Sequence, residues 1–200
     1  MATIWCFARS YADHAAELGN KVPDEPVVFL KGDHSIRGLE GVAPPFSEVH
    51  HEVEWVLRIA RDVGVGASAG WEDVDAVALG LDLTHRSRQK ALAGSGLPWA
   101  AAKSFASATV LGPWLAKSVV PDLDAVAFSL TVDGELRQRG NTRHLVHPVP
   151  ALLLWLTQWA NLVKGDIVFT GTPSGVGPLR PGQRFVMSLD EVGLSWEGQL

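Results

Sequence analysis

Residues 49–60, VHHEVEWVLRIA, place two closely spaced carboxylates in an otherwise apolar run. If this run is a β-strand, successive side chains point to opposite faces. One face then carries a histidine and four apolar side chains: His51, Val53, Trp55, Leu57 and Ile59. The other face carries His50, Glu52, Glu54, Val56 and Arg58. The pattern predicts a strand with one core-facing side and with Glu52 and Glu54 side by side on the other, about 6.6 Å apart at roughly 3.3 Å rise per residue.

This pair of carboxylates has two interpretations. Like charges at that separation repel unless water or a cation lies between them. Glu52 and Glu54 therefore either belong to a solvated strand face or form half of a metal site that needs a third oxygen ligand. A second alternating run supplies a candidate ligand, because its apolar side chains fall at Val77, Leu79, Leu81 and Leu83. Asp82 lies at the end of that predicted strand, on the face made of small residues.

The rest of the hydrophobic pattern predicts strands, few helices and many turns. Apolar strands are expected at residues 3–9 and 27–30, and residues 126–142 are typical of a hairpin that turns at Asp133-Gly134. A short helix is predicted at about residues 10–18. The one long helical stripe lies in residues 149–165, at Leu152, Leu153, Leu156, Trp159, Ala160 and Val163. Glycine and proline predict an irregular connection at residues 91–105. This order favours an α+β fold that is mostly β.

Composition and charge narrow the class of protein. The length of 200 residues suits one domain over residues 1–200, and the net charge of −5 without a basic cluster argues against nucleic-acid binding. Cys6 is the only cysteine and lies in an apolar strand, which predicts a buried thiol and a reducing compartment. The N-terminus lacks a secretory pattern, and the apolar run 151–156 is too short to cross a bilayer. We therefore predict a cytoplasmic protein without a nucleic-acid or membrane partner.

Two further motifs could carry chemistry. His14 and Glu17 are three residues apart on the predicted short helix, so they form either a surface pair or a general base oriented by a carboxylate. Residues 171–177, GTPSGVG, form either a tight turn or a loop that lines a ligand, and they lack the Lys-Ser/Thr ending of a phosphate-binding loop. We find no plausible serine nucleophile. Three carboxylates without cysteine favour Mg²⁺ or Mn²⁺, although His50 and His51 leave zinc open.

Several longer segments carry a family resemblance. In chain order they are ARSYADHAAELG, EPVVFLKG, HHEVEW, LDLTHRSRQ, GLPWAAAKSF, VDGELRQRGNT and GDIVFTGTPSGVGPL, and they run from Ala8 to Leu179. This succession resembles the fumarylacetoacetate hydrolase family, and most of all its small acylpyruvate-hydrolysing branch. The resemblance implies a mixed β-sandwich or β-roll with a few flanking helices. It also implies a homodimer.

The resemblance assigns roles to particular residues. It implies that Mg²⁺ or Mn²⁺ is bound by Glu52, Glu54 and Asp82. It implies that catalysis involves His14 and Glu17, on a lid-like helix, together with Lys103. Substrate contacts are implied for Arg9, Gln89 and Thr172. The chain departs from the family pattern at two places, with Ala8-Arg9-Ser10-Tyr11 for Gly-Arg-Asn-Tyr and Thr84-His85-Arg86-Ser87 for Thr-Ala-Arg-Asp. These departures lie near the expected pocket and leave the substrate open.

The reaction implied first is hydrolysis of the C–C bond of a 2,4-dioxo acid, such as fumarylpyruvate or acetylpyruvate, to pyruvate and a carboxylic acid. In that reaction His14, oriented by Glu17, would draw a proton from the attacking water. Lys103 would offset the negative charge that develops on the pyruvate enolate. The same machinery could instead decarboxylate or tautomerise oxaloacetate, or serve as a 2-hydroxyhepta-2,4-diene-1,7-dioate isomerase/decarboxylase. A third hypothesis is a binding domain without catalysis.

Overall fold

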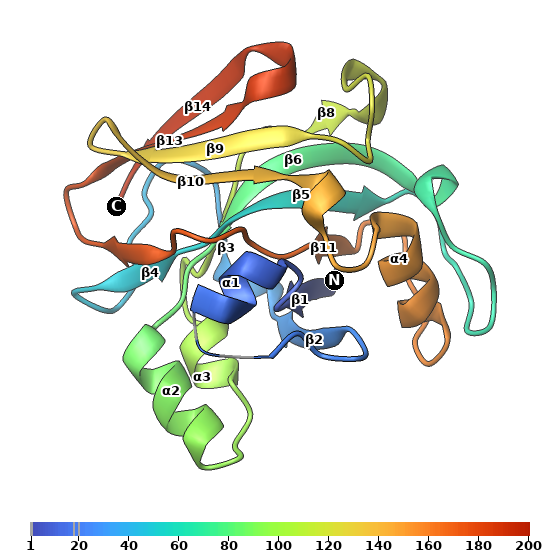
Figure 1. Ribbon diagram of the computed structural model, residues 1–200, viewed down its shortest axis with the longest axis horizontal. Coiled ribbons are helices and arrows are strands. Elements are labelled where there is room, and N and C mark those ends of the chain that lie inside the picture. The colour runs from blue at the N-terminus through green and yellow to red at the C-terminus, as the bar shows by residue number, and fades with distance from the viewer. Residues whose placement is uncertain (1, 18, 20) are drawn as a thin grey trace.

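The computed structural model describes residues 2–17, 19 and 21–200 (Figure 1). Within these residues the larger sheet has eight strands: β1 (Ile4–Ala8), β2 (Val27–Lys31), β3 (Ile36–Arg37), β5 (Val53–Ile59), β6 (Val74–Asp82), β7 (Thr109–Leu111), β8 (Leu115–Ala116) and β11 (Ile167–Phe169). Seven of them lie in the order β2-β1-β11-β5-β6-β7-β3, and β8 pairs with β6. Strands β2 and β3 stand at opposite ends of this order, yet only residues 32–35 separate them in the chain. The sheet must therefore curl until its two ends meet.

Side chains join the two ends of the curled sheet. The Lys31 ammonium at the end of β2 donates to the Ala108 carbonyl, just before β7, at 2.5 Å. Ser35 and Thr109 share a hydrogen bond of 2.8 Å between their hydroxyls. These contacts close the sheet into a roll. A small cluster of apolar side chains fills its interior: Ile4, Cys6, Val56, Ala78, Ile167 and Phe169. The predicted burial of Cys6 is confirmed.

A second sheet covers the other face of the roll. It contains β9 (Ala127–Val132), β10 (Glu135–Asn141), β13 (Arg184–Leu189) and β14 (Leu194–Gln199), in the antiparallel order β10-β9-β13-β14. In Figure 1 this sheet lies above β5 and β6. The main core fills the space between the sheets and includes Trp55, Leu81, Phe128, Leu130 and Met187. A pair of short strands, β4 (Val49–His51) and β12 (Gly177–Leu179), extends the fold at one end. The mostly β α+β prediction is confirmed.

The helices cover one mouth of the roll and one flank. Helix α1 (Ala12–Glu17), α2 (Arg86–Gly94) and α3 (Ala100–Lys103) lie at the mouth, and α4 (Val149–Thr157) lies at the flank (Figure 1). Short 3₁₀ helices occur at Asp33–Ser35, Trp71–Asp73, Lys117–Val119, Thr142–His144 and Asp190–Val192. Helix α1 matches the predicted short helix, of which Leu18 lies outside the described residues. None of the described helices is long and apolar enough to span a membrane.

Two sequence predictions about helices were wrong. The helix predicted for residues 149–165 ends at Thr157, because Leu162 exchanges backbone hydrogen bonds with Val63 instead of continuing the helix. Trp159 and Val163 are consequently about half exposed, at 51% and 48%, rather than buried on the stripe. The irregular connection predicted for residues 91–105 contains the end of α2 and all of α3. Its glycines and proline mark the turn between these helices and not a continuous loop.

Candidate active site

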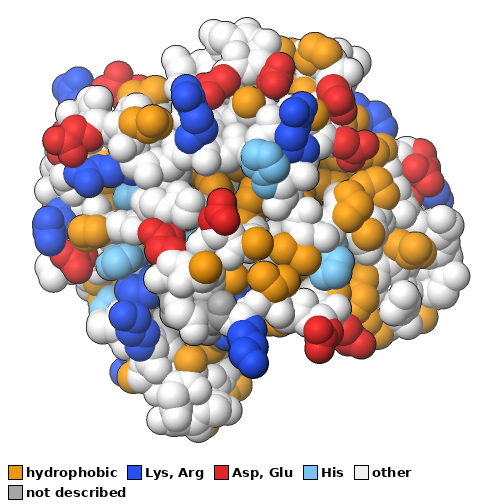
Figure 2. Space-filling model, in the orientation of Figure 1, with side chains coloured by type: hydrophobic (Ala, Val, Ile, Leu, Met, Phe, Trp, Pro, Cys, Tyr) orange, Lys and Arg blue, Asp and Glu red, His pale blue; other side chains and the backbone are white. Residues whose placement is uncertain are grey.

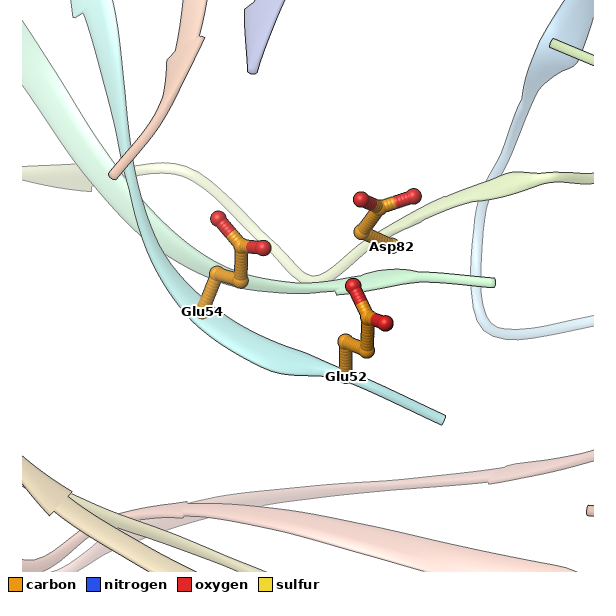
Figure 3. A group of neighbouring side chains, drawn as sticks. All are labelled: Glu52, Glu54 and Asp82. Carbon is orange, nitrogen blue, oxygen red and sulfur yellow. The ribbon is translucent and has the colours of Figure 1, made fainter. Parts of the chain in front are cut away.

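Strand pairing explains why three distant carboxylates meet. In the ladder between β5 and β6, Val53 lies opposite Leu81 and Glu54 lies opposite Gly80. The next position places Glu52 opposite Asp82, whose N–H donates to the Glu52 carbonyl at 2.9 Å. Because alternate residues share a face, the three acidic side chains point into the same space (Figure 3). An oxygen from each lies within 4.8 Å of the others.

The burial of these carboxylates rules out the first of the two interpretations. Glu52 and Glu54 are 5% and 2% exposed, so they do not form a solvated strand face. The structure also corrects the prediction of one continuous strand, since Glu52 separates β4 from β5. Beside Glu54, Gly80 has no room for a side chain, because a Cβ atom there would lie 2.9 Å from the Phe169 ring. The interior of the roll is therefore shaped around this acidic cluster.

Three cationic side chains surround the cluster. The Lys103 ammonium donates to Glu52 Oε2 at 2.8 Å and to Asp82 Oδ2 at 2.6 Å. The Arg86 guanidinium donates to Glu52 Oε1, and the Lys31 ammonium forms an ion pair with Asp82 Oδ1 at 2.5 Å. All three cations are buried. Sequence reasoning identified Lys103 through the family resemblance but missed Arg86 and Lys31, whose roles depend on the closure of the roll.

The cations are not shared equally among the carboxylates. Burial alone would raise the pKa of Glu52, but Lys103 and Arg86 outweigh it and lower that pKa below its usual value. The pKa of Glu54 is raised well above its usual value by burial and by the negative charges of Asp82 and Glu52. Burial would lower the pKa of Lys103, but the same two carboxylates raise it. Glu54 is thus the carboxylate that most lacks a compensating positive charge.

The donor set suits a hard divalent cation. All three candidate ligands are buried carboxylates, and one oxygen of each lies within 4.8 Å of the others. No histidine of residues 2–17, 19 and 21–200 joins this cluster. The ring of His51 instead donates from Nδ1 to the Gln138 amide oxygen at 3.0 Å. Oxygen ligands of this kind fit Mg²⁺ or Mn²⁺ better than zinc.

The predicted His–Glu pair lies on α1 beside the cluster. His14 is buried, and its Nδ1 lies 3.3 Å from Glu17 Oε2. The Glu17 carboxylate also accepts from the Gly175 backbone N–H, with distances of 3.1 and 3.2 Å to its two oxygens. This second contact ties α1 to the glycine-rich loop. A carboxylate that holds one ring nitrogen leaves the other free to exchange a proton inside the cavity.

One cavity of about 340 Å³ brings together all nine residues that the sequence predicted for the site. They are Arg9, His14, Glu17, Glu52, Glu54, Asp82, Gln89, Lys103 and Thr172. Residues that the sequence did not single out complete its lining: Phe7, Ala8, Phe29, Arg86, Lys90, Ala93 and Trp99. Gln89 accepts a hydrogen bond from Arg86 at 2.6 Å, which links it to Glu52 through the same guanidinium.

The glycine-rich loop contributes to the cavity through its backbone. The Gly171 N–H donates to Glu54 Oε2 at 2.6 Å. Gly171 adopts a φ of +104°, and a Cβ there would lie 2.6 Å from Ser10 Cβ, so only glycine fits. Of the two readings of GTPSGVG, the structure favours a loop that lines a cavity. The adjacent Thr172 hydroxyl donates to the Val53 carbonyl and accepts from Gln138, both at 2.8 Å.

The roll, the buried acidic cluster and the His–Glu pair together define a class of enzyme site. Residues 3–200 match the family described as fumarylacetoacetate (FAA) hydrolase, C-terminal. The chain therefore belongs to the fumarylacetoacetate hydrolase family, as its sequence motifs suggested.

Particular relatives narrow the comparison. The chain is 41% identical over 198 residues to a mitochondrial oxaloacetate tautomerase of Arabidopsis thaliana, covering 96% of this chain and 87% of the relative. It is 37% identical over 188 residues to a mitochondrial oxaloacetate decarboxylase of Dictyostelium discoideum, covering 90% and 85%. The crystal structure of fumarylpyruvate hydrolase from Pseudomonas aeruginosa, in complex with Mn²⁺ and pyruvate, superposes with a TM-score of 0.88 at 31% identity, covering 100% of this chain and 89% of that one.

Proposed function

We propose that this protein is a divalent-metal-dependent oxaloacetate tautomerase. The observation that carries the proposal is one cavity that contains three buried carboxylates, Lys103 and the His14–Glu17 pair, in a chain 41% identical to an oxaloacetate tautomerase. The family resemblance placed C–C bond hydrolysis first. We now place oxaloacetate tautomerisation, which was one of its alternatives, before hydrolysis. We propose Glu52, Glu54 and Asp82 as the ligands of Mg²⁺ or Mn²⁺. The Mn²⁺ complex of the Pseudomonas aeruginosa relative supports a metal of this type.

The charge of the cavity favours a substrate with two negative charges. Four basic side chains of the lining (Arg9, Arg86, Lys90 and Lys103) and the buried Lys31 lie with four acidic ones (Glu17, Glu52, Glu54 and Asp82). A bound divalent cation would add two more positive charges, and a dianionic substrate would offset them. Uncompensated charge in a buried site is costly. Oxaloacetate and fumarylpyruvate are dianions at neutral pH, whereas acetylpyruvate carries one carboxylate. We therefore propose a 2-oxo dicarboxylic acid as the substrate.

The proposed reaction moves one proton. In the keto form a C3–H bond breaks, its electrons form the C2=C3 double bond, and the C2 oxygen gains a proton. A divalent cation held by the three carboxylates would polarise the C2 carbonyl as a Lewis acid. His14 takes the C3 proton on Nε2, because Glu17 accepts from the protonated Nδ1 and holds the ring. Lys103 lies where its positive charge offsets the negative charge that develops on the C2 oxygen.

Hydrolysis of a 2,4-dioxo acid is the second candidate. It is supported by the likeness to fumarylpyruvate hydrolase and by the same His–Glu pair, which could instead draw a proton from water. We keep fumarylpyruvate as the hydrolytic substrate to test first, since it is a dianion. Decarboxylation of oxaloacetate, the activity in the name of the Dictyostelium discoideum relative, would need the cation site but no attacking water.

One set of assays distinguishes these reactions. Purified protein with Mn²⁺ or Mg²⁺ is given enol-oxaloacetate, and the decay of the enol absorbance is followed in parallel with pyruvate release. Fumarylpyruvate and acetylpyruvate are tested at the same concentrations. We expect metal-dependent enol–keto interconversion that is faster than pyruvate release and faster than cleavage of either acylpyruvate. Rapid cleavage of fumarylpyruvate without any acceleration of tautomerisation would replace the proposal by the hydrolase. No turnover at all would favour the binding domain.

We also propose a homodimer in a reducing compartment. Exposed apolar side chains on and after α4, including Leu154, Trp159 and Val163, offer surface for a second copy, and Figure 2 shows apolar side chains gathered in this region. Light scattering during gel filtration tests the oligomer. The single buried Cys6 is compatible with the cytoplasm, whereas both curated relatives above are named as mitochondrial. Cell fractionation distinguishes the two compartments.

A further inference from the structure

Residues 170–176, which connect β11 to β12 beside the acidic cluster, interrupt the backbone hydrogen bonding along β4 and β5. Strand β11 pairs with β5 as far as Val56, and β12 pairs with β4 from Val49 to His51. Between β11 and β12, residues 170–176 bulge away from the junction of β4 and β5. The Thr170 N–H still donates to the Trp55 carbonyl at 3.2 Å, but the backbone groups of Val53 meet no backbone partner from the loop. Unpaired backbone groups in a buried position are costly, so other atoms must satisfy them.

Gln138 fills this gap from the second sheet. It is 1% exposed, and its amide oxygen accepts from the Val53 N–H and from His51 Nδ1, both at 3.0 Å. Its amide nitrogen donates to the Thr172 hydroxyl at 2.8 Å and to the Pro173 carbonyl at 2.9 Å. The Val53 N–H and the Pro173 carbonyl fix the orientation of the amide, because one can only donate and the other can only accept. All four hydrogen-bonding positions of Gln138 are thus used.

The surrounding part of β10 is shaped to receive the loop. The pairing of β10 with β9 shifts between Leu136 and Gln138, an irregularity that redirects the side chains of the strand. A Cβ on Gly175 would lie 2.1 Å from the Arg137 carbonyl oxygen, and a Cβ on Gly140 would lie 2.9 Å from Pro173 Cγ. The loop therefore packs closely on both sides of Gln138, against the backbone at Arg137 and with the Pro173 ring at Gly140.

We propose that Gln138 is a positioning residue of the active site. It holds residues 170–176 in the bulged conformation from which the Gly171 N–H reaches Glu54 and the Gly175 N–H reaches Glu17. It also orients the Thr172 hydroxyl. That hydroxyl accepts from the Gln138 amide nitrogen and therefore donates its own hydrogen to the Val53 carbonyl. Gln138 does not line the cavity and acts through these neighbours. Its effects on turnover and on Mn²⁺ affinity rest on the proposed function, and its effect on the conformation of the loop does not.

The test compares Gln138→Met with a matched core variant. Methionine has a similar length and cannot donate or accept as an amide does. Leu156→Ala removes a fully buried side chain of α4 and lowers stability while it leaves the pairing of β9 and β10 intact. Hydrogen exchange of the peptide containing residues 170–177 is measured relative to a peptide from β13, and the affinity of metal-free protein for Mn²⁺ is measured by calorimetry. If Gln138→Met does not fold, Gln138→Asn replaces it, since its shorter amide cannot span the gap.

We expect the Gln138 variant to exchange at least about tenfold faster at residues 170–177 relative to β13, and to bind Mn²⁺ roughly 10–100-fold more weakly, as for other residues that orient metal ligands. Leu156→Ala should leave both the relative exchange rate and the Mn²⁺ affinity unchanged. Wild-type loop protection and wild-type Mn²⁺ affinity in a folded Gln138 variant would overturn the inference. Failure of the wild type to tautomerise oxaloacetate would overturn the proposed function and leave this result standing.

Discussion

Strands β5 and β6 have two faces of opposite character. One face packs Trp55, Leu57 and Leu79 into the core between the sheets, where each is almost fully buried. The other face, one residue out of phase, carries Glu54 and Asp82 into the roll. The same two strands thus build the core and the active site. Because strand side chains alternate, neighbouring residues can serve stability and chemistry separately.

The two faces differ in how they contribute to folding. Burial of a large apolar side chain contributes about 1.5–3 kcal/mol of stability. Buried ion pairs gain little on balance, because desolvation of both charges offsets their attraction. The apolar face therefore supplies most of the stability of these strands. This stability holds the acidic side chains in place. Substitutions on the two faces should have separable effects, and the predictions below test that separation.

The largest expected effect is on turnover. His14→Ala should lower the rate constant for oxaloacetate tautomerisation about 10²–10⁴-fold, because loss of a general base has this magnitude. That corresponds to roughly 3–5 kcal/mol of transition-state stabilisation. Mn²⁺ affinity should stay at the wild-type value, since His14 lies on α1 and outside the acidic cluster. Steady-state kinetics and calorimetry provide the measurements, with the exposed His144→Ala as control. Normal turnover by His14→Ala would remove the imidazole from the reaction.

A core substitution should show the reverse pattern. Leu57→Ala should lower the free energy of unfolding by about 2–5 kcal/mol, as other buried leucine truncations do. The exposed Leu136→Ala should change it by no more than about 0.5 kcal/mol. Urea denaturation measures both, and Mn²⁺ titration below the transition should give wild-type affinity for each. Loss of metal binding in folded Leu57→Ala would show that the two faces are coupled.

Removal of a cation from the acidic face should strengthen metal binding. Lys103→Met takes a positive charge away from Glu52 and Asp82. An opposite charge at this range changes a proton affinity by about 1–3 pKa units. A divalent cation that uses the same oxygens should therefore bind at least about tenfold more tightly, although turnover falls. Calorimetry of Lys103→Met and of the exposed control Lys164→Met tests the sign. Weaker binding would mean that Lys103 organises the ligands more than it repels the metal.

The smallest expected effect concerns Cys6, in the apolar interior of the roll. Burial raises the pKa of this thiol, and the negative charges of Asp82 and Glu54 raise it further. The folded protein should keep the thiol protonated above pH 8.5, where a free thiol ionises. Alkylation of native protein should therefore stay slow from pH 7 to 9, and the unfolded chain should react faster as pH rises. Rapid alkylation of native protein in this range would contradict the closed roll.

The acidic cluster could be predicted because it depends on the spacing of residues within single strands. Glu52 and Glu54 are two residues apart, and alternation alone places them on one face. Asp82 follows from the same rule applied to a second strand. By contrast, Arg86 and Lys31 meet the cluster only after the roll closes, and Gln138 meets the loop beside the cluster only after the second sheet docks. Gln138, for example, bonds to Val53 from 85 residues away in the chain. Nothing in the periodicity of either segment indicates that contact.

The errors at the helices have a related cause. The apolar stripe after Thr157 fits a helix locally, but the pairing of Leu162 with Val63 stops the helix from continuing. Between α2 and α3, glycine and proline indicate a turn, but the residues on either side of them favour helix. In both places a contact or boundary set by tertiary structure overrides the local pattern. The substrate contacts of Arg9, Gln89 and Thr172 stay predictions from the family resemblance.

Calorimetric titration of metal-free protein with Mn²⁺ tests the central claim most directly. The account predicts one site per chain in the wild type and in Glu48→Gln, an exposed carboxylate of the same segment paired with Arg180. Glu54→Gln, which replaces the least compensated carboxylate of the cluster, should bind at least about 100-fold more weakly, beyond the usual effect of a residue that only orients a ligand. Equal affinity and stoichiometry in Glu54→Gln and wild type would contradict a metal site on this face of β5 and β6.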